Sequence, residues 1–192
     1  SIFNQQLSWD MSKGKFPLIT GRHIYRKVFN TEFDWFINGE TNIKRFQDNG
    51  VKIWDAWADE NGDLGPVYGH QMRNFGNQSI DQLKNVIQFF VDKGEKLNMF
   101  VVQRSGDLFL GIPYDLALFS KLLLYISEQT LYLPGMINLQ IVDAHVYKNQ
   151  KEAIQEYFEQ PTYDFPDYTY KNGELKITNY QHRSEERRVG KE

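Results

Sequence analysis

The chain has 192 residues, the size of one ordinary domain, and can bury a hydrophobic core without disulfides or a structural metal. Its net charge of -3, with both signs interspersed, gives no basic face of the kind that binds nucleic acid. The absence of cysteine excludes disulfides, thiolate metal sites and thiol nucleophiles, and the four histidines lack metal-ligand spacing. We therefore expect a small-molecule partner and no bound metal.

The longest apolar stretch, residues 116–126, is well short of the roughly 20 residues that a membrane span needs. No basic start followed by an apolar signal region is present, and the chain begins at Ser1 instead of methionine. These observations favour a cytoplasmic protein whose natural N-terminus is missing.

In the first half of the chain, the spacing of apolar residues predicts three helices. Residues 24–38 carry apolar positions at helical spacing, and the Asn-Gly pair that follows is a typical helix stop. Thr41 is expected to cap a second, short helix that ends at residues 49–50. Ser79 and Gln82 have the spacing of a capping box at the head of a third helix.

The central part of the chain predicts two strands around one long helix. A β-branched and apolar run at 97–102 indicates a buried strand that delivers residues 103–105 to its end. Asp115 is a candidate cap for a helix that continues to Thr130. Apolar and polar residues then alternate over 137–141, which predicts a second strand that ends at 143–145.

A last helix is expected at residues 150–159, before an aromatic stretch at 163–170 and a hairpin turn at 171–174. This order of helices, strands and hairpin predicts an α+β fold. Residues 183–192 are almost all charged, so we interpret them as a solvated, disordered or foreign tail.

Four blocks of sequence carry a resemblance to a known family. They are Glu40-Thr41-Asn42-Ile43, residues 53–69, the stretch Gln103-Arg104-Ser105-Gly106-Asp107-Leu108-Phe109-Leu110-Gly111, and Asp143-Ala144-His145-Val146-Tyr147. Together they resemble the thymidylate synthase family. The resemblance extends over residues 1–182 and implies one domain in which a mixed sheet packs against helices.

The resemblance also implies a chemistry. Thymidylate synthases transfer a one-carbon unit from 5,10-methylenetetrahydrofolate to carbon 5 of deoxyuridylate. A cysteine thiolate first adds to carbon 6, and the folate later supplies hydride and leaves as dihydrofolate. A homodimer, a folate co-substrate and a deoxypyrimidine monophosphate are the partners expected on this basis.

Residue roles follow from the same resemblance. Glu32 would organise proton transfer and Tyr68 would assist proton removal. The residues expected to bind the folate are Ile53, Trp54, Asp107 and Gly111. The residues expected to bind the nucleotide are Arg104 and Ser105 at the phosphate, Asp107, Asp115 at the base, and His145 and Tyr147 at the sugar.

Each of these residue types has an ordinary structural role as well. Arg104 fits a phosphate because guanidinium is a rigid fork of donors, but alone it would be a surface ion-pair residue. Trp54 could fill the core, and His145 could be a structural histidine. Glu32 could be an exposed carboxylate or a half-buried acid with a raised pKa. The family resemblance is what favours the functional reading of each.

The chain departs from the family at the nucleophile. Between Ile87 and Phe89 the family would insert several dozen residues, among them the catalytic cysteine, and residues typical of the family are also missing at both ends. Conjugate addition needs a soft, readily ionised nucleophile, which Ser105 does not provide. We therefore expect an incomplete domain, a weakened dimer and no turnover as the chain stands.

Asp115 occupies the position at which the family usually has a base-reading asparagine. An amide matches the ring N–H and carbonyl of uracil, whereas a carboxyl group suits the exocyclic amine of cytosine. Deoxycytidylate, the substrate of the related deoxycytidylate hydroxymethylases, is thus an alternative, and so is a plain helix cap. A non-catalytic nucleotide-binding module is a further alternative.

Overall fold

The computed structural model describes residues 1–76, 78–89 and 95–182, so the predicted tail lies outside the described residues. The elements in chain order are β1 (Ile2–Asp10), η1 (Met11–Lys13), α1 (Arg26–Ile37), α2 (Lys44–Asp48), α3 (Tyr68–Arg73), α4 (Gln82–Phe89), β2 (Lys96–Asp107), α5 (Gly111–Thr130), β3 (Leu133–His145), η2 (Lys148–Gln150), α6 (Lys151–Phe158), β4 (Asp167–Lys171) and β5 (Glu174–Thr178). Helices and mixed sheet together confirm the α+β fold.

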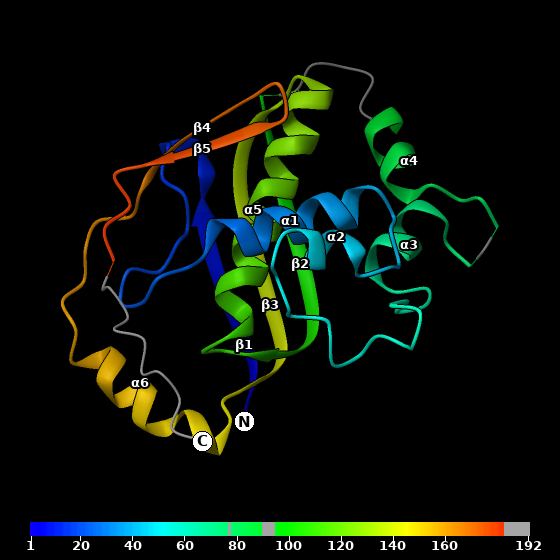
Figure 1. The fold of residues 1–192 in the computed structure, drawn as a ribbon. Coiled ribbons are helices and arrows are strands. Elements are labelled where there is room, and N and C mark those ends of the chain that lie inside the picture. The colour runs from blue at the N-terminus through cyan, green and yellow to red at the C-terminus, as the bar shows by residue number, and fades with distance from the viewer. Residues whose placement is uncertain (77, 90–94, 183–192) are drawn as a thin grey trace.

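A three-stranded sheet with the order β1-β3-β2 forms the centre of the fold (Figure 1). β3 runs antiparallel to β1 and parallel to β2. Ile137, Leu139 and Ile141 are fully buried, whereas the alternate residues Asn138 and Gln140 are only half-buried. The alternation predicted for this strand is therefore confirmed, and it gives the sheet one buried face.

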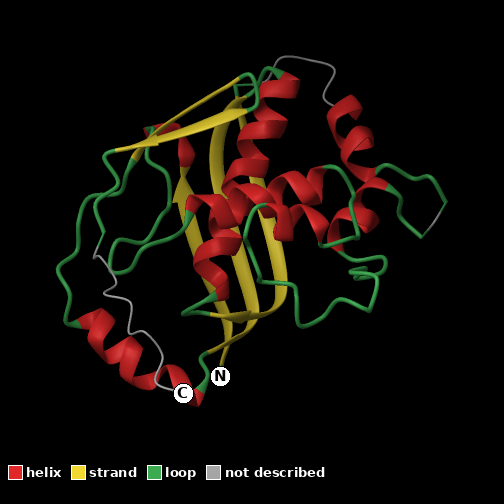
Figure 2. Cartoon of the chain, viewed as in Figure 1, coloured by secondary structure: helices red, strands yellow, loops and turns green. Residues whose placement is uncertain are grey.

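The buried face of the sheet packs against α5, and α1 packs on α5 in turn (Figure 2). Leu139 and Ile141 of β3 form a cluster with Ile112 near the start of α5. Ala117 and Leu123 of α5 join a second cluster with Phe29 of α1. Burial of these apolar side chains holds α1 and α5 in fixed positions beside β2.

The predicted hairpin is confirmed at β4 and β5. Asn172 and Gly173 connect the two strands and both have positive φ, at 52° and 78°, as a two-residue turn of this kind requires.

No helix in the described ranges is long and apolar enough to cross a bilayer.

Apart from the short 3-10 helices η1 and η2, the elements that were not predicted from the sequence are β1 and α3. β1 is an edge strand whose residues are mostly exposed, so Ile2 and Phe3 show no clear alternation between a buried and a solvated face. α3 is only six residues long, which is too short for a helical period to stand out.

All three predicted helix caps are wrong. Ser79 has a φ of 58° and lies before α4, whose first turn is capped by the Asp81 carboxylate, which accepts a hydrogen bond from the Lys84 N–H. Ahead of α2, Thr41 donates its hydroxyl proton to Asp63, while the neighbouring Asn42 side chain accepts from a helix N–H.

The third cap matters for function. α5 begins at Gly111 and not at Asp115, and Pro113 lies in its first turn, where the missing N–H is not needed. The carboxylate that accepts backbone N–H groups just before the helix belongs to Asp107. Asp115 is the fifth residue of α5, so the cap interpretation of this carboxylate is overturned.

Candidate active site

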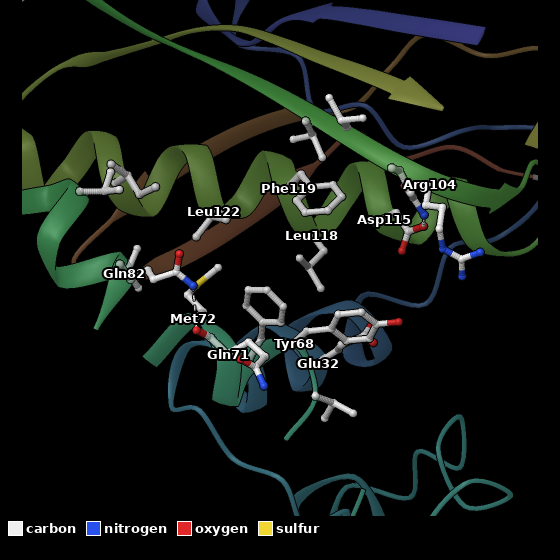
Figure 3. Close-up of a pocket in the computed structure, with 18 of the residues that line it drawn as sticks. Glu32, Tyr68, Gln71, Met72, Gln82, Arg104, Asp115, Leu118, Phe119 and Leu122 are labelled. Carbon is white, nitrogen blue, oxygen red and sulfur yellow. Dashed lines mark hydrogen bonds between the residues drawn. The ribbon is translucent and has the colours of Figure 1, made fainter. Parts of the chain in front are cut away.

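A cavity of about 1020 Å³ lies between β2 and the helices α1, α3, α4 and α5. The predicted site residues that line it are Glu32, Trp54, Tyr68, Arg104, Ser105 and Asp115. In Figure 3, Arg104, Asp115 and Glu32 lie toward one end of this cavity, and Met72 and Gln82 lie toward the other. Residues predicted from distant parts of the sequence are thus brought together at one polar end.

Glu32 enters the cavity from α1. Phe33 and Trp35 on the same helix are buried in the core, which leaves Glu32 half-buried at the cavity wall. The Trp54 indole N–H donates to Glu32 Oε1 over 3.2 Å. Burial, reinforced by the charge of Asp115, raises the pKa of Glu32 to about 7, against the weaker opposing effect of the Trp54 hydrogen bond. Near neutral pH this carboxyl group is therefore poised to take up or release a proton.

Asp115 reaches the same end of the cavity from the second turn of α5. The Gln103 side-chain amide donates to Asp115 Oδ2 over 2.7 Å. Burial raises the pKa of Asp115, and the Gln103 hydrogen bond only partly offsets this effect. The site thus contains two carboxyl groups, on Glu32 and Asp115, that both resist ionisation.

Gln103 was missing from the predicted site residues, although it is the first residue of one matching block. From the sequence, Gln103 was expected only at the end of a strand, without a role in the site. Its side chain lines the cavity and orients the carboxyl group of Asp115. The signal that was available is its position directly before Arg104, at even spacing from Ser105 along one face of β2.

Arg104 and Ser105 lie within β2, which continues to Asp107 instead of ending at 102 as predicted. The parallel register of β2 and β3 aligns Asp107 with His145, so the carboxyl ends of both strands meet. The Ser105 hydroxyl oxygen lies 3.4 Å from His145 Nδ1. The Tyr147 ring stands perpendicular to the His145 ring, with 5.2 Å between the centroids. Neither His145 nor Tyr147 lines the cavity, but His145 lies beside Ser105 and Tyr147 packs against His145.

The carboxylate of Asp107 is occupied by internal hydrogen bonds. Its Oδ1 accepts from the N–H groups of Phe109 and Leu110, and its Oδ2 accepts from the Gln150 amide over 2.7 Å. Asp107 therefore fixes the loop that leads into α5 and holds Gly111 beside it. The predicted contacts of Asp107 and Gly111 with the folate stay predictions, and neither residue lines the cavity.

Trp54, which is predicted to bind the folate, differs from the neighbouring Trp57 in its surroundings. Trp54 stacks on the fully buried Trp35 at 6.3 Å and contacts the cavity, where the exposed Tyr68 ring lies 6.1 Å from it. Trp57, by contrast, is 70% exposed. Ile53 is 38% exposed and lies outside the cavity lining.

Apart from Gln82, the other end of the cavity is apolar, and it was not predicted from the sequence. Its lining comes from three helices and includes Met72, Leu83, Val86, Leu122 and Ile126. Sequence periodicity identifies such residues only as apolar helix faces, without showing that they lack a covering partner. Within the described ranges, no three His, Cys, Asp or Glu side chains come together as they would around a metal ion.

Comparison with known proteins identifies the family. The sequence model described as thymidylate synthase matches residues 1–90 and 86–186. A curated thymidylate synthase of Vesicomyosocius okutanii subsp. Calyptogena okutanii (strain HA) is 38% identical over 192 residues, which cover 81% of this chain and 72% of the relative. These matches identify an α+β protein of a nucleotide-modifying class. The chain belongs to the thymidylate synthase family, a family of methyltransferases that use a folate co-substrate.

Proposed function

We propose that this chain binds a deoxypyrimidine monophosphate and 5,10-methylenetetrahydrofolate in the cavity beside β2, as a thymidylate synthase-type protein. The observation that carries the proposal is the meeting of Glu32, Asp115 and Arg104 at one end of a single cavity. Base, phosphate and proton-transfer groups are needed together by this chemistry, and three separate elements supply them here.

The phosphate is assigned to Arg104 and Ser105. The Arg104 side chain is exposed at the cavity mouth, where its planar guanidinium offers paired donors to a dianion. Ser105 adds a hydroxyl donor one residue further along β2. His145 beside Ser105, and Tyr147 beside His145, are assigned to the sugar.

The folate is assigned to the wall formed by Trp54 and Tyr68. An indole face offers a planar apolar surface for a pterin ring, and the adjacent Glu32 provides a hydrogen-bonding carboxyl group. With a pKa of about 7, Glu32 can act as both acid and base at neutral pH, and Tyr68 is placed to assist.

Turnover is a separate question from binding, because the sequence contains no cysteine. A thiolate is readily formed near neutral pH, whereas a serine hydroxyl is hardly ionised there, and the Ser105 hydroxyl already lies beside His145. We propose that the chain binds its ligands without completing one-carbon transfer.

Deoxycytidylate is a second candidate ligand, favoured by Asp115. Burial raises the pKa of Asp115. A carboxylate oxygen accepts a hydrogen bond from the exocyclic amine of cytosine, and a proton shared with the ring nitrogen completes the match. Uracil presents the opposite pattern and is better matched by asparagine.

A homodimer is proposed through the sheet face that points away from α5. This face exposes Phe100 (62%), Val102 (60%) and Val142 (43%) on the neighbouring strands β2 and β3. Exposed apolar residues that gather on one face are typical of an interaction surface. Sedimentation velocity should detect a dimer that Phe100→Lys weakens. A monomer at all concentrations would contradict this part of the proposal.

Calorimetry with deoxyuridylate and deoxycytidylate tests the ligand assignment. Arg104→Gln should weaken binding of both nucleotides by roughly tenfold or more, since one charge-assisted pair is lost. Lys171→Gln, which removes an exposed charge far from the cavity on the β4-β5 hairpin, is the control and should bind as the parent does. Asp115→Asn should shift preference toward deoxyuridylate. An unchanged preference would remove the deoxycytidylate alternative.

A further inference from the structure

Gln150 is a buried polar residue outside the cavity lining. It lies at the end of η2, directly before α6, and only 6% of it is exposed. Burial of a side-chain amide is costly unless its donor and its acceptor both find partners. Here Nε2 donates to Asp107 Oδ2 over 2.7 Å, and Oε1 accepts from the Tyr147 N–H over 2.9 Å. The amide therefore joins the end of β2 to the segment that follows β3.

One side of this bridge fixes the end of β2. Asp107 Oδ1 accepts from the N–H groups of Phe109 and Leu110 over 2.9 and 3.1 Å. A donor on the second carboxylate oxygen keeps the group from turning away from these two N–H groups. Gln150 thus holds the carboxylate that organises the chain directly after Ser105.

The other side of the bridge fixes Tyr147. The Tyr147 carbonyl accepts from the Gln150 N–H over 3.0 Å, so the two residues close a single turn with two hydrogen bonds. The Tyr147 residue is 56% exposed, and its ring packs against His145. Because an exposed side chain has few contacts of its own, its placement depends on the backbone turn that Gln150 closes.

We propose that Gln150 is a positioning residue of the nucleotide site, which holds Tyr147 and the Asp107 loop in place before the ligand arrives. Gln150 acts through these two residues and does not touch the nucleotide itself. Groups that are fixed in advance lose less conformational entropy on binding, so the bridge raises affinity. The inference rests on the proposed nucleotide binding, but the bridge itself can be tested without a ligand.

Hydrogen exchange of the free chain tests the bridge. Gln150→Leu keeps most of the side-chain volume and removes both side-chain hydrogen bonds. The amides of Phe109 and Leu110 bond to Asp107 and not to Gln150. They should nevertheless exchange roughly tenfold faster in the variant, because the carboxylate that accepts from them has lost its fixed position. Unchanged exchange at these two amides would overturn the proposal.

Calorimetry with deoxyuridylate and deoxycytidylate tests the effect on binding. Gln150→Leu should weaken binding of each bound nucleotide by roughly tenfold. Gln160→Leu is the matched control and should bind as the parent does, since the Gln160 amide donates to the Glu156 carbonyl of α6 and not to the bridge. Parental affinity in a folded Gln150→Leu chain would overturn the positioning role. Failure of the proposed function is distinguishable, because the parent itself would then bind neither nucleotide and the role of Gln150 would fail with it.

Gln150→Glu separates the two hydrogen bonds of the bridge. It keeps an acceptor for the Tyr147 N–H but places a second carboxyl group against Asp107. Two facing carboxylates repel at pH 8, whereas at pH 5 a proton shared between them restores a hydrogen bond. The nearby ionisable groups of His145 and Arg22 are the same in parent and variant, so their titration cancels in a ratio of affinities at one pH. The affinity of Gln150→Glu relative to the parent should therefore recover as the pH falls, while that of Gln150→Leu stays low. A ratio for Gln150→Glu that does not change with pH would contradict a role through Asp107.

Discussion

Replacing Glu32 by glutamine removes the carboxyl group whose ionisation the fold opposes most clearly. Its pKa rises from 4.5 to about 7, mainly through burial. The folded chain holds this proton more tightly than the unfolded chain does. Glu32 therefore contributes stability below pH 4.5, and that contribution is lost as the pH rises through 7. The difference between these two pKa values corresponds to a change of roughly 3 kcal/mol in the free energy of unfolding.

Urea unfolding at pH 4.5 and pH 8 measures this effect. The parent should lose roughly 3 kcal/mol over the interval from this group, and Glu32→Gln should lack that loss while keeping an acceptor for the Trp54 N–H. At pH 8 the variant should be the more stable protein. Glu60→Gln, at an exposed position, serves as the control and should keep the parental dependence. A parental pH dependence in Glu32→Gln would refute the assignment of the raised pKa to Glu32.

Four other substitutions test packing by urea unfolding. Lys121 is buried and pairs with the exposed Asp34. Lys121→Met leaves no unpaired charge in the interior and should therefore change the free energy of unfolding by less than about 1 kcal/mol. Lys121→Ala should lower it by about 2 to 3 kcal/mol, because it leaves a cavity. A larger loss in the methionine variant would contradict this. Gly69→Ala would place Cβ 2.7 Å from the Phe36 carbonyl oxygen and should cost roughly 2 kcal/mol, while Gly111→Ala meets only ordinary contacts and should be nearly neutral. If Gly69→Ala and Gly111→Ala lowered the free energy of unfolding equally, α3 would have shifted away from α1 to make room for the methyl group, which would contradict the close contact.

Strong periodicity made the central elements predictable. The alternation at Ile137, Leu139 and Ile141 fixed a buried strand, and the long apolar run before Thr130 fixed a buried helix. The edge strand β1 was not predictable, because its pairing with β3 and not its own composition determines its conformation. Helix starts were wrong because several neighbouring polar residues compete for each cap, as Ser79 and Asp81 do.

The candidate site was likewise predictable in one part and not in another. The residue types at the polar end were predictable from the matching blocks, but the role of Asp115 was not, since the same carboxyl group serves as cap or as base reader. The start of α5 at Gly111 removes the cap role, and the hydrogen bond from Gln103 shows how the side chain is held. The apolar end of the cavity depends on which helix faces stay uncovered in three dimensions, so no local pattern in the sequence reveals it.

The central claim is that the chain keeps a nucleotide site without the nucleophile. Isothermal titration of the full chain with deoxyuridylate and deoxycytidylate, in the presence of the folate and with product analysis of the same samples, tests it most directly. We predict saturable binding of at least one nucleotide, weakened by Arg104→Gln, and no methylated or hydroxymethylated product. Absence of binding to both nucleotides by a folded chain, or turnover without any cysteine, would contradict the account.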